Sequence, residues 1–334
     1  MVISAIRKQD IIYVMAHAEQ SYTGTFLADK GDPNTHISQG ILGVELTRET
    51  LLNIAEFVKN QPQPFSLVID FSKIKDIQSN QQKWVIELKK RVQKLIFTNI
   101  SDFIVKKLNI DLYDHNEISG DAYAAFYLTD AKEQIQLENL DALFEDAFVA
   151  RLQKSVIETK TEDGYRSNSP IYIPKFVDIK SIIVEDPHFF LYVVYRLATT
   201  INLKREWAEH AVKPILFCQN LNGAYIASIL SSFLKWNLLS MDHIGPVNKV
   251  YTNIGSKIKS DARYLVVSDM ICLGTELRIC QNIINYSGGR YIGNASIIKV
   301  NTLIPEHQPK DAVSVYEISK GHNPIDFKIL TALD

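Results

Sequence analysis

The chain has 334 residues, 46% of them hydrophobic, so it can bury a hydrophobic core. It exceeds the chain length that usually folds around one core, which favours more than one domain. Its formal net charge is only -2, with Lys and Arg interspersed among Asp and Glu, and we therefore expect no binding to nucleic acid or to a membrane surface. The longest wholly apolar runs, such as residues 189–195, fall short of the about 20 residues that cross a bilayer, and the first residues lack the pattern of a signal peptide. Composition thus predicts a cytoplasmic protein of two domains.

The N-terminal half begins with the pattern of an α/β module. Residues 66–71 (SLVIDF) predict a short buried strand, and residues 81–97 carry apolar side chains at helical spacing. This strand, turn and helix resemble the core of STAS domains, the fold of anti-sigma factor antagonists, in which a serine in the loop can be phosphorylated. Here Asn80 and Gln81 occupy the matching positions and Ser79 lies one place earlier, so the switch residue is missing. The resemblance implies a STAS-like module that binds a protein partner or dimerises.

A polar stretch with Gly and Pro, residues 158–170, separates two hydrophobic regions and predicts the domain boundary. The domains are then residues 1–157, a STAS-like α/β domain with a helical extension, and residues 171–334, joined by the linker 158–170. We expect the helical extension, within residues 122–156, to pack against one or both domains.

Beyond the linker, candidate strands and helices alternate. Strands are predicted at residues 179–184, 214–218, 265–267 and 295–300, and helices at residues 187–202, 224–234 and 276–287. This alternation predicts an α/β domain with a parallel sheet flanked by helices, and such sheets bind ligands at the carboxyl ends of their strands. The three cysteines in this half, Cys218, Cys272 and Cys280, form no CxxC pair and are interpreted as ordinary core residues, which disfavours zinc and disulfides.

Residues 264–277 (YLVVSDMICLGTEL) read as a buried strand, a glycine turn and the start of a helix. Backbone N–H groups of such a turn, with the positive end of the helix, can surround a phosphate. The segment resembles the PRPP-binding loop of type I phosphoribosyltransferases. The resemblance implies that Asp269 orients the ribose, as a catalytic residue if the protein is an enzyme, and that Gly274 and Thr275 receive the 5′-phosphate. This sequence departs from the family pattern at four ligand positions: Ser268, Cys272, Leu273 and Glu276.

Two flanking segments strengthen this resemblance. Residues 216–227 resemble the pyrophosphate loop of the same family, with Asn222 and Gly223 in the turn and no basic residue there. Residues 166–187 resemble the opening of orotate phosphoribosyltransferases, which implies that Ser169 and Tyr172 lie on the base, or hood, side of the site. The resemblance covers about residues 165–305. The interval 235–263 holds Lys249, Lys257 and Lys259 but lacks the basic cluster of a catalytic loop. Lys249 and Lys257 could take its place, but the favoured interpretation is that they are ordinary surface lysines.

Three functions are compatible with these patterns. The first is a phosphoribosyltransferase-fold protein that binds PRPP, a nucleotide or another ribose 5-phosphate compound in a regulatory role with little catalysis. The second is an active orotate-type phosphoribosyltransferase, a pentosyl glycosyltransferase that joins a nucleobase to PRPP and releases pyrophosphate. The third is a protein-interaction scaffold with an empty pocket. The resemblance implies Mg²⁺ only as a companion of bound PRPP, with no direct protein ligand, and it implies a homodimer.

Overall fold

The computed structural model describes residues 1–23, 40–109, 114–118, 123–127, 136–158, 165–166, 171–173, 175–241, 257–272, 274–301, 311–318 and 330–331. The chain forms two compact units, residues 1–147 and residues 148–334. The division between them falls inside helix α5 (Leu140–Lys154). Most of the predicted linker 158–170 lies outside the described residues, so that boundary stays a prediction.

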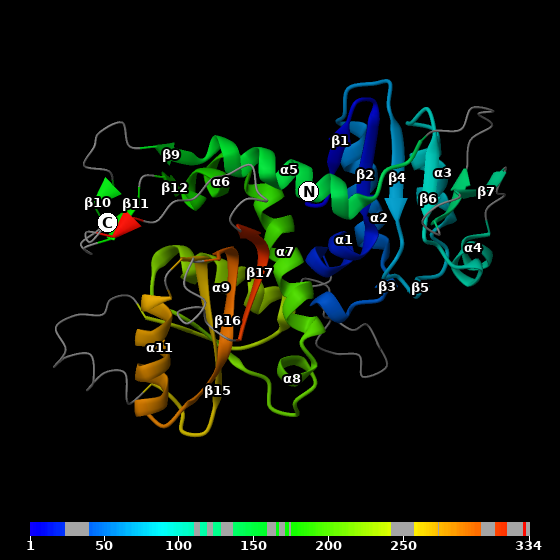
Figure 1. Ribbon diagram of the computed structural model, residues 1–334. Helices are drawn as coiled ribbons and strands as arrows, with labels where there is room; N and C mark the ends of the chain where they lie inside the picture. The colour runs from blue at the N-terminus through cyan, green and yellow to red at the C-terminus, as the bar shows by residue number, and fades with distance from the viewer. Residues whose placement is uncertain are drawn as a thin grey trace. The chain divides into compact units, whose positions relative to one another are not determined.

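The N-terminal unit is built on a six-stranded mixed sheet with the order β1-β2-β4-β6-β8-β7 (Figure 1). Strands β2, β4 and β6 are parallel, whereas β1, β8 and β7 pair antiparallel with their neighbours. The strands are β1 (Ile6–Lys8), β2 (Ile11–Met15), β4 (Ser66–Asp70), β6 (Leu95–Thr98), β7 (Asp114–Ile118) and β8 (Tyr123–Tyr127). A separate parallel pair joins β3 (Glu45–Leu46) to β5 (Asp76–Ile77).

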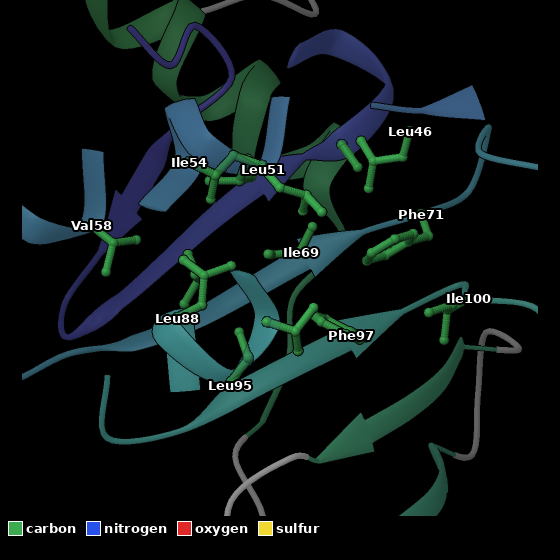
Figure 2. Close-up of a cluster of buried hydrophobic side chains, with 14 of the residues drawn as sticks. Leu46, Leu51, Ile54, Val58, Ile69, Phe71, Leu88, Leu95, Phe97 and Ile100 are labelled. Atoms are coloured by element: carbon green, nitrogen blue, oxygen red, sulfur yellow. The ribbon is translucent and has the colours of Figure 1, made fainter. Parts of the chain in front are cut away.

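Helices connect these strands: α1 (Ala16–Thr23), the short 3-10 helix η1 (Gly40–Leu42), α2 (Arg48–Lys59), α3 (Gln82–Lys89) and α4 (Asp102–Leu108). Thr47 caps helix α2: its side chain accepts a hydrogen bond from the backbone N–H of Thr50 and so satisfies a donor of the first turn. Its residues Leu51, Ile54 and Val58 recur at helical spacing and are fully buried. They belong to one hydrophobic cluster with residues of the sheet, as Figure 2 shows.

The structure confirms an α/β unit in this half and corrects the predicted helix of residues 81–97. The helix ends at Lys89, and Leu95, Ile96 and Phe97 lie in β6, where they pair with β4. Apolar residues that match a helical period can equally form a short buried strand, and here three consecutive buried residues lie on both faces of the sheet. The STAS-like character of the unit stays a prediction.

The C-terminal unit is built on a five-stranded sheet in which every neighbouring pair is parallel, with the order β14-β13-β15-β16-β17. The strands are β13 (Ile215–Cys218), β14 (Leu238–Ser240), β15 (Arg263–Ile271), β16 (Arg290–Val300) and β17 (Ala312–Ile318). Numbered in chain order within this sheet, they follow the sequence 2-1-3-4-5, which is a doubly wound arrangement. Further short strands form two separate small sheets: β9 (Val156–Glu158) pairs with β12 (Lys175–Val177), and β11 (Ile171–Ile173) pairs with β10 (Tyr165–Arg166) and β18 (Leu330–Thr331).

The helices of this unit are α6 (Ile179–Glu185), α7 (Pro187–Leu203), α8 (Arg205–Ala208), α9 (Leu221–Leu234) and α11 (Thr275–Tyr286). Both faces of the parallel sheet are covered by helices, whereas α6 packs against α7. Helix α11 packs on the face that carries Phe217, Tyr264 and Val266, with which it shares a hydrophobic cluster. Helix α9 packs on the opposite face, and α7 packs against α9 and β17 (Figure 1). Within the part of the chain that the structure describes, no helix is both long and apolar enough to span a membrane.

The predicted strand at residues 179–184 is wrong, because these residues form helix α6. The side chain of Asp178 accepts a hydrogen bond from the backbone N–H of Lys180 and so caps the first turn. The buried residues Ile179 and Ile182 are three apart and share one face of the helix. A short apolar run with a capping acid before it therefore formed a helix.

Candidate ligand site at the switch point of the parallel sheet

The candidate site lies where the winding of the C-terminal sheet reverses. Strands β13 and β15 are neighbours in the sheet, although α9 and β14 separate them in the chain. From this point the chain winds toward β14 on one side and toward β16 and β17 on the other. In open parallel sheets the loops at the carboxyl ends of two such strands diverge, and ligands bind there. The two segments that sequence analysis selected, after Cys218 and after Asp269, follow these two strands.

The loop after β13 is fixed by a cap and by a close helix contact. The side chain of Asn220 accepts a hydrogen bond from the backbone N–H of Gly223 at 2.6 Å and begins helix α9. A Cβ atom on Gly223 would lie 2.8 Å from the carbonyl oxygen of Val267 and 3.0 Å from the Asn220 Oδ1 atom. Glycine is therefore required for the first turn of α9 to approach β15 this closely.

We expect Gly223→Ala to lower the free energy of unfolding by about 2 kcal/mol, because the methyl group meets a backbone carbonyl of a central strand. Helix propensity alone predicts the opposite sign, a gain of up to about 1 kcal/mol for this change. Urea unfolding measures the difference. Ser228→Ala, an exposed change on the same helix, serves as the control and is expected to have little effect. A stabilised Gly223→Ala variant would contradict the close approach.

Asp269 links the two loops. Its Oδ1 atom accepts a hydrogen bond from the backbone N–H of Met270 at 2.8 Å, and its Oδ2 atom accepts one from the Asn222 side chain at 2.6 Å. Asn222 belongs to the first turn of α9, so this bond spans the switch point. Both side chains remain partly exposed. A partly solvated carboxylate and amide thus lie side by side at the carboxyl edge of the sheet.

The loop after β15 leads into helix α11. Gly274 has a φ of 72°, a left-handed conformation that favours glycine, and it precedes the first residue of the helix. Among the described residues no side chain caps this end of the helix. Thr275 and Glu276 are both exposed in the first turn. The N-terminal amides and the helix dipole give this end a partial positive charge, which attracts an anion. The negative charge of the Glu276 carboxylate repels the same anion.

The cysteines of this region are protonated thiols. Burial raises the pKa of the Cys272 thiol to about 12, and the nearby carboxylates of Asp269 and Glu276 act in the same direction. Burial likewise raises the pKa of Cys280 to about 12, and its thiol donates to the Gln219 Oε1 atom at 3.0 Å. The thiolate is the reactive form of cysteine, so these residues are not nucleophiles at neutral pH. Cys218 and Cys280 are buried, as expected of core residues, whereas Cys272 is only partly buried, and its place among the ligand-binding residues stays a prediction.

Ser268 lies on the other face of the sheet from Asp269. Successive side chains of a strand point to opposite faces, and Ser268 follows Tyr264 and Val266 on the face toward α11. It is 5% exposed, and its hydroxyl has no hydrogen-bond partner among the described residues. It pairs in register with Ser296 of β16. The position that carries the first acid in the resembled family is therefore occupied by a buried serine.

The structure brings together most of the residues that the sequence selected. At the switch point, the end of β15, the short turn after it and the first turns of α9 and α11 contain Asn222, Gly223, Asp269, Cys272, Gly274, Thr275 and Glu276. Leu273 and Ser169 fall outside the described residues, as does Lys249, and only the backbone of Tyr172 is placed, in β11. Sequence reasoning assigned no role to Gln219 and Asn220. The signal for Asn220 was an Asn three residues before a glycine at the start of a helix.

No protein-family model matches this chain, and no curated protein matches it. Among solved structures, an adenine phosphoribosyltransferase from Thermoanaerobacter pseudethanolicus is similar at 13% identity and a TM-score of 0.36, covering 51% of this chain and 99% of that one. The adenine phosphoribosyltransferase from Rhodothermus marinus is similar at 14% identity and a TM-score of 0.38, covering 52% of this chain and 99% of that one. The orotate phosphoribosyltransferase from Aeropyrum pernix is similar at 14% identity and a TM-score of 0.35, covering 51% of this chain and 93% of that one. Likeness at this level does not by itself assign a function.

Proposed function

We propose that the C-terminal unit binds a ribose 5-phosphate compound, either PRPP or a nucleotide, and that its role is regulatory with little catalysis. The observation that carries the proposal is the hydrogen bond of 2.6 Å between Asn222 and Asp269 across the switch point. It sets a carboxylate at the carboxyl end of β15, immediately before a glycine turn and an uncapped helix N-terminus. Acceptors for ribose hydroxyls and donors for a phosphate follow one another along the chain.

In the proposed complex Asp269 accepts hydrogen bonds from the ribose hydroxyls. The backbone amides that begin α11 and the hydroxyl of Thr275 donate to the 5′-phosphate, as helix N-termini do for many phosphates. Glu276 lowers the affinity for that phosphate by repulsion, because it stands in the same first turn. Recognition at moderate affinity fits this combination better than tight binding of a highly charged substrate.

The charges near the site argue against efficient transfer of the phosphoribosyl group. Residues 219–223 and 269–276 contain two acids and no Lys, Arg or His. Lys257 and Lys259 lie near the amino end of β15, where the backbone N–H of Lys259 donates to the Tyr264 hydroxyl. That end is about 17 Å from Asp269 along the strand, at 3.3 Å per residue. A departing pyrophosphate would need cations that these described residues do not supply.

A magnesium ion would accompany PRPP and would not occupy a protein cage. Within the described residues no group of three or more His, Cys, Asp or Glu side chains could hold a metal. Both oxygens of Asp269 already accept hydrogen bonds. Mg²⁺ commonly binds through phosphate oxygens and water with few protein ligands, and the proposed site is compatible with that mode. The homodimer and the protein partner of the N-terminal unit also remain proposals, which sedimentation of the full chain with and without ligand would examine.

We expect calorimetry with PRPP·Mg²⁺ or nucleoside monophosphates to detect binding to the full chain, and Asp269→Asn to weaken it about tenfold or more. A hydrogen bond to a charged acceptor contributes roughly 1.5–3 kcal/mol, which corresponds to that range. Asp261→Asn is the matched control, since it removes an exposed carboxylate of the same unit near the amino end of β15.

Three outcomes would change the proposal. Dissociation constants all above about 1 mM would remove the ligand hypotheses and leave the interaction scaffold. Equal affinity of wild-type and Asp269→Asn protein would place the ligand elsewhere. Release of pyrophosphate on addition of orotate or another nucleobase would identify an active orotate-type enzyme.

A further inference from the structure

We propose that Asn222 is a specificity-determining residue that completes recognition of the ribose hydroxyls, so that the site prefers ribose over 2-deoxyribose. This inference rests on the proposed function. It assigns to the loop after β13 part of the acceptance of hydrogen bonds from the ribose hydroxyls. Strand β15 does not supply a second acceptor, because the residue before Asp269 is a serine that points away from the site.

The first step is the orientation of Ser268. It lies on the face that carries Tyr264 and Val266 and that helix α11 covers, whereas Asp269 bonds to α9 on the opposite face. With 5% of its surface exposed, Ser268 cannot share a ligand with Asp269 without a change of strand register. Asp269 is therefore the one carboxylate of β15 that reaches the proposed ribose, and each of its oxygens already accepts a hydrogen bond, so an acceptor on the loop of β13 would add to its capacity.

The second step is the chemistry of the Asn222 amide. A carboxylate only accepts hydrogen bonds, so the group of Asn222 that faces Asp269 at 2.6 Å is its NH₂. This bond uses one of the two amide hydrogens and leaves the carbonyl oxygen of the amide on the adjoining side. The carboxylate and the amide carbonyl then form two neighbouring acceptors. One ribose hydroxyl can donate to Asp269 and the other to Asn222.

The third step is that the position of Asn222 is well defined. It lies between the capping residue Asn220 and Gly223, whose contact with Val267 sets the distance from α9 to β15. The Asn222 side chain is partly exposed, and its NH₂ group is held by Asp269. An acceptor held in place before the ligand arrives loses little conformational entropy on binding, which favours discrimination.

The test is titration of the full chain with ribose 5-phosphate and with 2-deoxyribose 5-phosphate, for wild-type protein and Asn222→Ala. We expect wild-type protein to prefer ribose 5-phosphate by about fivefold to tenfold, the usual contribution of a neutral hydrogen bond. Asn222→Ala should bring the ratio of the two affinities to within about twofold, because it removes one hydroxyl acceptor. A purely structural role of Asn222 would weaken both ligands equally and leave that ratio unchanged.

Leu221→Ala is the matched control, since Leu221 is adjacent, 83% exposed and carries no polar group. The inference is overturned if wild-type protein shows no preference, or if Asn222→Ala retains it. Loss of the preference in Ser268→Ala instead would return the role to β15. If wild-type protein binds neither sugar phosphate, the inference also fails. The titrations with PRPP and nucleoside monophosphates then decide independently whether the proposed function also fails.

Discussion

Replacing Gly293 by alanine is expected to lower the free energy of unfolding of the C-terminal unit by about 4 kcal/mol. The added Cβ would lie 2.5 Å from the Trp207 Cζ2 atom and 2.7 Å from the carbonyl oxygen of Asp311. Overpacking of this kind typically costs about 1–3 kcal/mol, and the φ of 152° adds strain for any residue with a Cβ. Both contacts involve atoms that cannot move aside cheaply, since one is backbone and the other is a ring that is 2% exposed.

The position of Gly293 explains why the clash is unavoidable. Strand β16 contains a register shift at this point, so that Tyr264 pairs with Tyr291 and Leu265 with Gly293. A bulge of this type commonly carries glycine at a conformation that other residues avoid. Trp207 of helix α8 fills the space above it. A change at Gly293 therefore disturbs both the packing of the Trp207 ring and the pairing of β16 with β15.

Urea unfolding followed by tryptophan fluorescence checks this prediction. Gly288→Ala is the matched control in the same unit. Its φ is 83°, but its Cβ would meet only atoms of Ser260, the nearest being the Oγ atom at 3.2 Å, so we expect a loss of about 1 kcal/mol. In a Trp207→Phe background the effect of Gly293→Ala should become smaller, because the clashing part of the indole is absent. Equal losses for the two glycine variants would show that the close contacts contribute nothing.

Sequence reasoning was most successful where one period held over several residues. The strand–helix alternation at residues 214–234 and 264–287 predicted β13, α9, β15 and α11, and hence a parallel sheet. It failed where an apolar run was short: residues 179–184 form a helix and residues 95–97 a strand. Periodicity cannot separate these two cases, because three or four buried residues satisfy both patterns.

The candidate site was only partly predictable. Its two loops could be selected from their residues, but the order of the strands that brings them together depends on where the chain turns after each crossover. The bond between Asn222 and Asp269 joins residues 47 apart and has no local signal. The direction of the Ser268 side chain, in contrast, follows from strand alternation alone: once Asp269 faces the site, Ser268 must lie on the opposite face of the sheet.

The N-terminal unit contains two buried ionisable residues on α1 with opposite responses to pH. Glu19 is fully buried and accepts hydrogen bonds from the backbone N–H groups of Ile3 and Ser4 and from the Ser4 hydroxyl. Burial raises the pKa of the Glu19 carboxyl from 4.5 to about 7. Burial also lowers the pKa of His17 from 6.5 to about 4, with the charge of Lys73 acting in the same direction. Both side chains are therefore neutral in the folded protein near pH 5.5.

The sign of each contribution follows from proton binding. Glu19 has a raised pKa in the folded state, so its contribution to stability is complete below pH 4.5 and is lost as the pH rises through 7. His17 has a lowered pKa, so its contribution is complete above pH 6.5 and is lost as the pH falls through 4. Between about pH 4.5 and 6.5 the unfolded chain holds one proton on His17, and the folded chain holds one on Glu19. The two effects cancel, and together they leave stability almost independent of pH in this range.

Glu19→Gln is expected to remove this cancellation. The free energy of unfolding of the variant, relative to wild-type protein, should rise by about 3 kcal/mol between pH 4.5 and 7, since a shift of one pKa unit corresponds to about 1.4 kcal/mol. His17→Asn should show the opposite slope, with relative stability falling over the range from about pH 4 to 6.5. Urea unfolding of the three proteins at half-unit intervals measures both slopes.

Differences from wild-type protein are the relevant quantity, because they remove the contribution of surface carboxylates such as Asp76, whose pKa is lowered by its hydrogen bond to Lys107. The amide side chain of the Glu19→Gln variant retains the acceptor that Ile3 and Ser4 require, so the comparison isolates the titrating proton rather than the loss of a hydrogen bond. A Glu19→Gln variant whose stability follows that of wild-type protein at every pH would mean that Glu19 is ionised in the folded state. Its three strong donors would then offset burial and leave the pKa near its ordinary value of 4.5, and the pH dependence of His17 would already be visible in wild-type protein.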